Sequence, residues 1–188
     1  MEKTIWPGST QLAPSPVVLV GTGDGRRYPW NLITVAWTGT LCSDPPIVGI
    51  GIRKSRFSYR AIKELRCFTV NLPTAEMAET VDFCGVVSGT DTDKFAARKL
   101  TAVKANKIMA PLVDECPLSL ECAVKQVLEL GSHDLFLGEV IAVQVTSDLI
   151  DDKGKLDLEK ANLLAYAHGH YYSLGQELGH FGFSVKKK

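Results

Sequence analysis

Two long segments in the second half of the chain show apolar residues in alternation with other residues. The first runs from Leu118 to Leu130 and the second from Asp134 to Val145, with Gly131-Ser132-His133 between them. A period of two is typical of a strand that buries one face, whereas a helix repeats every 3.6 residues. The short connection predicts that the two strands pair as an antiparallel hairpin. The chain is therefore expected to fold around an antiparallel sheet.

Shorter apolar runs that end at turn residues predict four more strands. They are Pro16–Gly21, Asn31–Trp37, Pro46–Ile52 and Phe68–Leu72. Helical patterns are fewer, and the expected short helices are Ser58–Leu65, Thr74–Val81, Asp93–Lys99 and Leu156–Leu164. About six strands with peripheral helices, without regular β-α-β alternation, favour a mainly β fold, a closed antiparallel barrel. We expect one domain over residues 1–188, with a core from about residue 14 to residue 184.

Charge and composition exclude several classes of partner. The 21 basic and 21 acidic residues cancel, so there is no bulk attraction to nucleic acid or to an anionic membrane. No apolar run approaches the roughly 20 residues of a membrane span, and the first residues lack the apolar stretch of a signal peptide. We therefore expect a cytoplasmic protein. Five widely spaced cysteines without a C-x-x-C pair argue against a zinc site or a disulfide framework.

Two motifs that resemble ligand sites each lack a required part. Gly21-Thr22-Gly23-Asp24-Gly25 follows a predicted strand, as a dinucleotide-binding loop does. Such a loop must open a helix that holds the pyrophosphate, but a β-branched run follows here, so we expect a hairpin-like turn. His168-Gly169-His170 places two imidazoles at alternate positions with no third ligand in view, so we expect no metal site.

The segment Arg53–Arg60 places four basic and two serine side chains where a predicted strand ends and a predicted helix begins. Free N–H groups and the dipole at a helix N-terminus favour an anion. Arginine and serine add donors that suit a phosphate. A phosphate site and a solvated basic turn look alike in sequence, and both interpretations stay open at this point.

A second candidate segment, Ala36–Pro46, leaves a strand and passes through small and hydroxyl residues. A flavin ring needs a flat slot with backbone donors and acceptors, and small residues let the backbone approach it. The alternative is a barrel corner with a packed Trp37. His133 is either a turn residue capped by Asp134 or a hydrogen-bond donor that faces a ligand.

With these residues in hand, the chain from about Pro16 to Ser184 resembles the flavin-reductase-like, FMN-binding split-barrel family, and its flavoredoxin branch in particular. Each matching motif is short, and the specificity lies in their order and spacing over nearly the full chain. The motifs are Asn31-x-x-Thr34-Val35-Ala36-Trp37, Ser43-Asp44-Pro45-Pro46, Arg53-x-Ser55-x-x-Ser58-Tyr59, Phe68-Thr69-Val70-Asn71-Leu72, Asp93-Lys94-Phe95, Pro117, Gly131-Ser132-His133-Asp134-x-Phe136-x-Gly138-Glu139-Val140 and Leu164-Ala165-Tyr166-x-x-Gly169-x-Tyr171-Tyr172-x-Leu174-Gly175.

The resemblance implies a six-stranded antiparallel Greek-key split barrel, a homodimer, and one non-covalent FMN per subunit near the dimer interface. It implies that the ring lies along Trp37–Thr40 and that Arg53, Ser55 and Ser58 hold the phosphate. His133 would lie near the ring and orient the electron donor, and His168–Tyr172 would close the site, from the same subunit or its neighbour. Cys42 stands where relatives often carry serine or asparagine. The full set of expected FMN-binding residues is Asn31, Ala36, Trp37, Thr38, Gly39, Thr40, Leu41, Arg53, Lys54, Ser55, Ser58, Lys94, His168 and Tyr171.

Three functions follow as hypotheses. The first is an oxidoreductase in which bound FMN takes a hydride from NADH or NADPH and passes electrons to free flavin, ferric iron or a redox protein. The second is an FMN-loaded electron carrier that does not oxidise NAD(P)H itself. The third is a barrel that has lost its flavin and acts as a binding module. The presence of Arg53, Ser55, Ser58 and Lys94 argues against the third.

Overall fold

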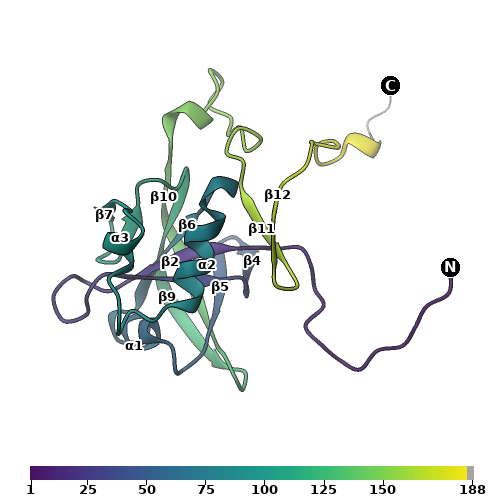
Figure 1. Ribbon diagram of the computed structural model, residues 1–188. Helices are drawn as coiled ribbons and strands as arrows, with labels where there is room; N and C mark the ends of the chain where they lie inside the picture. Colours follow the sequence, from purple (N-terminus) through teal and green to yellow (C-terminus); the bar gives the residue numbers. More distant parts are fainter. Residues whose placement is uncertain (186–188) are drawn as a thin grey trace.

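The computed structural model describes residues 1–185, and its main feature is one curled antiparallel sheet that forms a half-barrel (Figure 1). The mainly β, split-barrel fold class is therefore confirmed. The order of hydrogen-bonded strands is β3-β2-β6-β9-β10-β5-β4, so β3 and β4 are the two edges of this sheet. The strands are β2 (Val18–Thr22), β3 (Asn31–Val35), β4 (Thr38–Ser43), β5 (Pro46–Ile52), β6 (Cys67–Leu72), β9 (Leu118–Glu129) and β10 (Asp134–Val145).

The predicted long hairpin is present as β9 and β10, and it explains much of the curl. Its register shifts between Leu137 and Gly138 and again between Val140 and Ala142. Such bulges increase local twist and bend a sheet. Gly138 lies inside this bend, where a Cβ atom would come within 2.5 Å of the Phe68 ring. A glycine is therefore needed for the sheet to close over Phe68.

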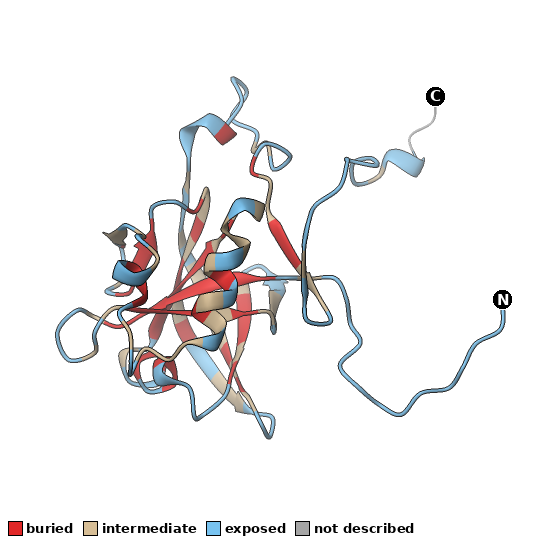
Figure 2. Cartoon of the chain, viewed as in Figure 1, coloured by how far each residue is buried: buried red, intermediate tan, exposed pale blue. Residues whose placement is uncertain are grey.

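Helix α1 (Phe57–Leu65) packs into the concave side of the sheet. Tyr59 and Ile62 join a core of inward-facing strand residues that includes Ile50, Phe68 and Phe136. Strand β5 shows the alternation clearly, because Val48, Ile50 and Ile52 are all buried. Figure 2 shows the buried residues concentrated on the strands and on the inner faces of the helices.

A second core lies between strands β2 and β3 and the remaining helices. These are η1 (Ala75–Met77), α2 (Ala78–Val86) and α3 (Lys94–Ala97). Leu19 and Leu32 of the sheet pack there with Val81 and Cys84 of α2 and with Phe95 of α3. The β3 strand therefore has one side toward each core, and its start, Asn31, is buried between them.

Smaller elements complete the fold. A three-stranded sheet joins β1 (Ser15–Pro16), β11 (Leu164–Ala167) and β12 (His170–Ser173), and a two-stranded sheet joins β7 (Ala102–Lys104) and β8 (Pro111–Val113). Short 3₁₀ turns occur at η2 (Ser147–Leu149) and η3 (Phe183–Val185). Both ends of the described chain run away from the body as exposed arms (Figures 1 and 2). No helix within residues 1–185 is long and apolar enough to cross a membrane.

Several predicted elements need correction. The helix expected over Leu156–Leu164 is absent, because Asn162 takes a left-handed conformation and the backbone N–H of Leu164 bonds to Pro73 as a strand begins. The strand expected over Asn31–Trp37 ends at Val35, and a separate edge strand, β4, starts at Thr38. The main sheet therefore gains a seventh strand. The helix expected over Thr74–Val81 begins as a 3₁₀ turn and continues to Val86.

Candidate functional site

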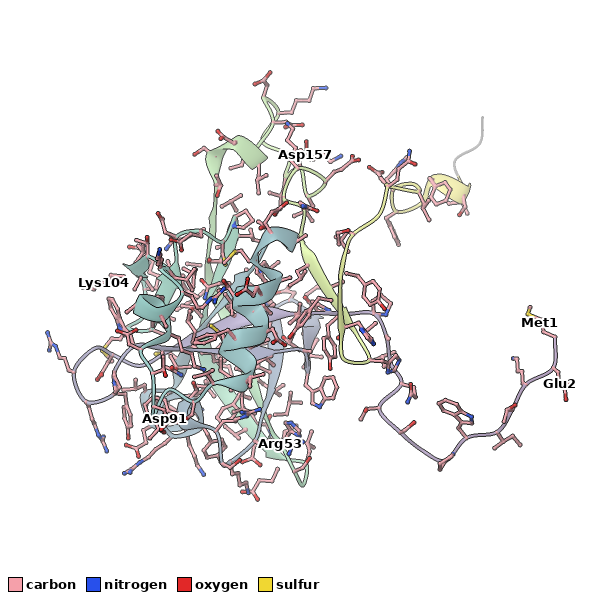
Figure 3. All side chains as sticks on the ribbon, viewed as in Figure 1. Met1, Glu2, Arg53, Asp91, Lys104 and Asp157 are labelled. Carbon is pink, nitrogen blue, oxygen red and sulfur yellow. The ribbon has the colours of Figure 1, made fainter. Side chains whose placement is uncertain are left out.

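Two adjoining cavities lie at the N-terminal end of helix α1, and they share Ile33, Arg53 and Arg56 in their walls. The first, here called the α1 cavity, has a volume of about 260 Å³ and is lined by Asn31, Arg53, Ser55, Ser58, Gly89 and Lys94 among others. The second, the Trp37 cavity, has a volume of about 410 Å³ and is lined by Ala36, Trp37, Gly51, Arg53, Arg56, His133 and Tyr166 among others. Arg53 lies at the same lower end of the body as the tip of the β9–β10 hairpin (Figure 3).

A buried hydrogen-bond cluster forms one wall of the α1 cavity. The Ser58 hydroxyl accepts from Asn31 Nδ2 at 2.8 Å and from Thr22 Oγ1 at 3.1 Å. All three side chains are buried, so the cluster ties the first turn of α1 to β2 and β3. Because both bonds end on the Ser58 oxygen, the Ser58 proton remains available for another acceptor. Gly89 packs so closely that a Cβ atom would lie 2.4 Å from Asn31 Oδ1.

Lys94 contributes a buried cation to the same cavity. Its side chain is 3% exposed, and Nζ donates to the backbone carbonyls of Leu32 and Cys84, each at 2.7 Å. Burial lowers the pKa of Lys94 to about 8, since desolvation disfavours the charged form. Within residues 1–185 no carboxylate forms an ion pair with Lys94. The cavity therefore holds an ammonium group that lacks a counter-ion.

The start of α1 adds uncapped backbone donors. Arg56 is the N-cap residue, its side chain makes no capping hydrogen bond, and the first turn contains no acidic residue. The first N–H groups of a helix have no partner within the helix, and the dipole favours an anion there. The segment Arg53–Arg60, which was interpreted as a possible anion site, therefore lies beside a buried lysine and contains a helix N-terminus.

The Trp37 cavity has an aromatic and basic lining. Trp37 is 43% exposed and meets Tyr166 edge-on, with ring centroids 6.4 Å apart. His133 is half-buried, and its Nδ1 lies 2.9 Å from the Ser132 hydroxyl. Desolvation, followed by the positive charges of Arg53 and Arg56, lowers the pKa of His133, so the imidazole is neutral at pH 7. No acidic side chain lines this cavity within the described part of the chain.

Eight of the predicted residues come together in these two cavities. They are Asn31, Ala36, Trp37, Arg53, Ser55, Ser58, Lys94 and His133. Tyr171 lines neither cavity but contacts Tyr166, which does. The two rings meet edge-on with centroids 5.7 Å apart, and the Tyr171 hydroxyl donates to Asp82 at 3.1 Å. Burial, followed by this hydrogen bond, raises the pKa of Tyr171 to about 12.

The structure does not bring the other predicted residues into the cavities. Thr38, Gly39, Thr40 and Leu41 lie on the edge strand β4, where Leu41 is 56% exposed. His168 is exposed in the β11–β12 turn. Lys54 points to the other side of the loop, where Nζ bonds to Glu129 at 3.0 Å.

Sequence reasoning missed Arg56, Gly89 and Tyr166 as wall residues of the cavities. Arg56 lay within the basic segment, and its place at the helix N-cap was the signal that could have singled it out. Tyr166 lay within a family motif without an assigned role. Nothing in the local sequence around Gly89 indicates that this loop folds back onto Asn31.

Comparison with known proteins places the chain in a family. The model of the family described as flavin reductase like domain matches residues 10–175. The chain therefore belongs to the flavin reductase like family, as the motifs predicted.

Several solved structures are similar to this chain over nearly its full length. Flavoredoxin of Desulfovibrio vulgaris (Miyazaki F) is similar with a TM-score of 0.91 at 34% identity, over 100% of both chains. Flavoredoxin from Methanosarcina acetivorans follows with a TM-score of 0.87 at 30% identity, over 99% of this chain and 100% of that one. An FMN-binding protein from Thermus thermophilus, solved with bound 1-cyclohex-2-enone, gives 0.79 at 26% identity, over 96% and 97% of the two chains.

Among curated relatives, a protein of Archaeoglobus fulgidus is 36% identical over 113 residues, which cover 60% of this chain and 64% of that protein. The chain thus matches less than two thirds of that relative's length.

Proposed function

We propose that this protein binds FMN in the two adjoining cavities and uses it as an oxidoreductase. The FMN phosphate would occupy the α1 cavity and the ring would occupy the Trp37 cavity. The similarity to two flavoredoxins and to an FMN-binding protein supports the choice of FMN. When bound, FMN would supply hydride and single-electron transfer, chemistry that amino-acid side chains do not provide.

The observation that carries the proposal is the buried, unpaired Lys94 ammonium. A cation removed from water without a counter-ion is costly, and such groups are normally paired. Two backbone carbonyls satisfy two of its three N–H donors, which leaves one for a ligand. A phosphate would provide both the missing charge and an acceptor. Ser55, Ser58 and the first N–H groups of α1 line the same space and favour the same ligand.

At the ring end, the residues would orient the ring and stabilise negative charge. Arg53 and Arg56 lie between the two cavities, where a positive potential favours a reduced, more negative flavin. Trp37 and Tyr166 would give the ring an aromatic wall. We propose that neutral His133 donates a hydrogen bond that orients the electron donor, NADH or NADPH, without adding a further positive charge.

The alternative is an FMN-loaded electron carrier that does not oxidise NAD(P)H. The two flavoredoxin structures favour this candidate specifically. Anaerobic stopped-flow mixing of the FMN-loaded protein with NADH and with NADPH separates the two functions. Rapid bleaching of the flavin absorbance by either nucleotide supports the reductase. Persistence of the yellow colour, with bleaching by dithionite only, would refute the reductase in favour of the carrier.

We also propose that the protein is a homodimer and that β4 lies at the interface. Within residues 1–185 β4 is the edge of the main sheet, so its outer backbone groups lack a strand partner. Exposed apolar side chains gather on β4 and on the C-terminal half of β10, namely Leu41, Ile141 and Val143. Exposed apolar surface of this kind is typical of interfaces. Sedimentation at several concentrations tests this, and a monomer with full FMN affinity would contradict it.

A further inference from the structure

We propose that Asp134, together with Tyr59 and Lys54, is a positioning unit that couples the α1 cavity to His133. None of these three residues lines either cavity. When the α1 cavity is occupied, the unit would fix the tip of the β9–β10 hairpin, which carries His133. This inference rests on the proposed function, because it assumes that the α1 cavity takes the FMN phosphate.

Asp134 is the centre of the unit. Its side chain is 1% exposed, and Oδ2 accepts a 2.6 Å hydrogen bond from the Tyr59 hydroxyl. Its other oxygen, Oδ1, is the one buried side-chain N or O atom within residues 1–185 that lacks a hydrogen-bond partner. The nearest cation to it is Lys54 Nζ at 3.6 Å, which also bonds to Glu129. A buried carboxylate with so few partners makes its remaining bonds energetically important.

Each member of the unit is next in the chain to a residue that lines a cavity. Lys54 lies between Arg53 and Ser55, Tyr59 follows Ser58, and Asp134 follows His133. Adjacent Cα atoms are linked at a fixed spacing of about 3.8 Å, so a displacement of one residue also acts on its neighbour. Through direct contacts, the three side chains thus connect the loop Arg53–Ser55, the first turn of α1 and the hairpin tip.

The base of the hairpin tip is held in the sheet, where Asp134 pairs with Glu129 of β9 and with Ile52 of β5, and residues 130–133 extend beyond these pairs. Gly131 and Ser132 are exposed, and the turn is closed by a backbone bond from Leu130 N to His133 O at 3.1 Å. The Tyr59 ring also packs edge-on against Phe136 at 5.5 Å, which keeps its hydroxyl on the β10 side of α1. The Tyr59–Asp134 bond is thus a side-chain contact at the base of the tip, and it adds to the backbone pairing in placing His133. Loss of that bond should leave α1 and the strand pairing in place but loosen the tip.

The test is hydrogen exchange of the full-length protein with and without FMN, in the wild type and in Tyr59→Phe. In the wild type, we expect FMN to slow amide exchange in residues 129–134 by at least about fivefold, the lower end of typical coupling between sites. In Tyr59→Phe, FMN should still slow exchange in residues 53–58 but change residues 129–134 by less than twofold. Equal protection of residues 129–134 in both proteins would overturn the proposal.

Tyr28→Phe provides a matched control. Tyr28 also lies beside a carboxylate, since interaction with Glu64 of α1 is the main cause of its raised pKa. That contact joins α1 to the β2–β3 loop instead of the hairpin, so Tyr28→Phe should behave like the wild type. A hairpin effect in Tyr28→Phe of the same size would show a general loosening of α1 and would overturn the specific role of Asp134.

Lys54→Met is a second variant in case Tyr59→Phe does not fold, because Lys54 is exposed and its replacement leaves the core intact. We expect it to reduce the FMN-induced protection of residues 129–134, and unchanged protection would contradict the proposal.

Donor kinetics add a separate readout, in which Tyr59→Phe raises the KM for the nucleotide about fivefold while the FMN affinity stays within about threefold. If the wild type does not bind FMN at all, both the proposed function and this inference fail. FMN binding without hairpin protection overturns the inference alone.

Discussion

Replacing Lys94 with methionine should reduce the preference of the protein for FMN over riboflavin, which lacks the phosphate. Methionine is one atom shorter than lysine, so it fills most of the same space without the charge. Truncating one partner of a buried, hydrogen-bonded charge pair costs about 2–5 kcal/mol. We take about 2–3 kcal/mol here because Arg53 and the helix N-terminus still attract the phosphate. That corresponds to roughly a 30- to 150-fold loss of FMN affinity.

The substitution also acts on the fold, and the assay must separate the two effects. Without Lys94 the buried carbonyls of Leu32 and Cys84 lose their donor, which costs about 1–3 kcal/mol for each group left unpaired. Removing a buried, unpaired cation offsets part of this loss. Urea unfolding of the flavin-free protein measures the net change. Fluorescence titrations with FMN and with riboflavin then report how much of the lost affinity depends on the phosphate.

The control for this experiment is Lys104→Met, which makes the same chemical change at an exposed position of β7. It should bind both flavins like the wild type. In Lys94→Met we expect riboflavin affinity to change less than threefold while FMN affinity falls by the amount above. If riboflavin affinity falls as far as FMN affinity, Lys94 supports the fold and not the phosphate. Unchanged FMN affinity would place the phosphate elsewhere.

Three further predictions concern the same cavity. FMN affinity should be nearly constant between about pH 6.5 and 7.5 and should fall by up to tenfold per pH unit above pH 8. The reason is that only the protonated Lys94 attracts the phosphate, and the pKa of Lys94 is about 8. An FMN affinity that stays constant up to about pH 9.5 would refute this role. Gly89→Ala should weaken FMN binding at least tenfold, since its Cβ would lie 2.4 Å from Asn31 Oδ1, and calorimetry with unchanged affinity would contradict that packing. Ser58→Ala should destabilise the flavin-free protein by about 1–3 kcal/mol in urea, because it removes the acceptor of two buried hydrogen bonds, and a loss below about 0.5 kcal/mol would argue against the cluster.

The fold class could be predicted because its main signals are local. Alternation in Leu118–Leu130 and Asp134–Val145 is a property of neighbouring residues, and it led directly to the observed β9–β10 hairpin. The wrong helix over Leu156–Leu164 shows the limit of such signals. Its conformation is decided by contacts with a distant segment, where Leu164 bonds to Pro73.

Part of the candidate site could be predicted because the residues concerned are neighbours in the sequence. The basic segment Arg53–Ser58 is contiguous, so its chemistry is visible in the sequence. Lys94 entered through the family resemblance, and the absence of a counter-ion around it emerges only from tertiary packing. Lys54 was expected in the site because it sits among the other donors. The geometry of the loop turns it toward Glu129 and Asp134 instead, which no linear pattern indicates.

The most direct test of FMN binding is the visible absorption spectrum of the purified full-length protein, before and after addition of excess FMN and gel filtration. We expect the bands of bound flavin at one FMN per chain, with retention that depends on the phosphate, so that riboflavin is lost on the column. A colourless protein that takes up no FMN, or one that retains riboflavin and FMN equally, would contradict it.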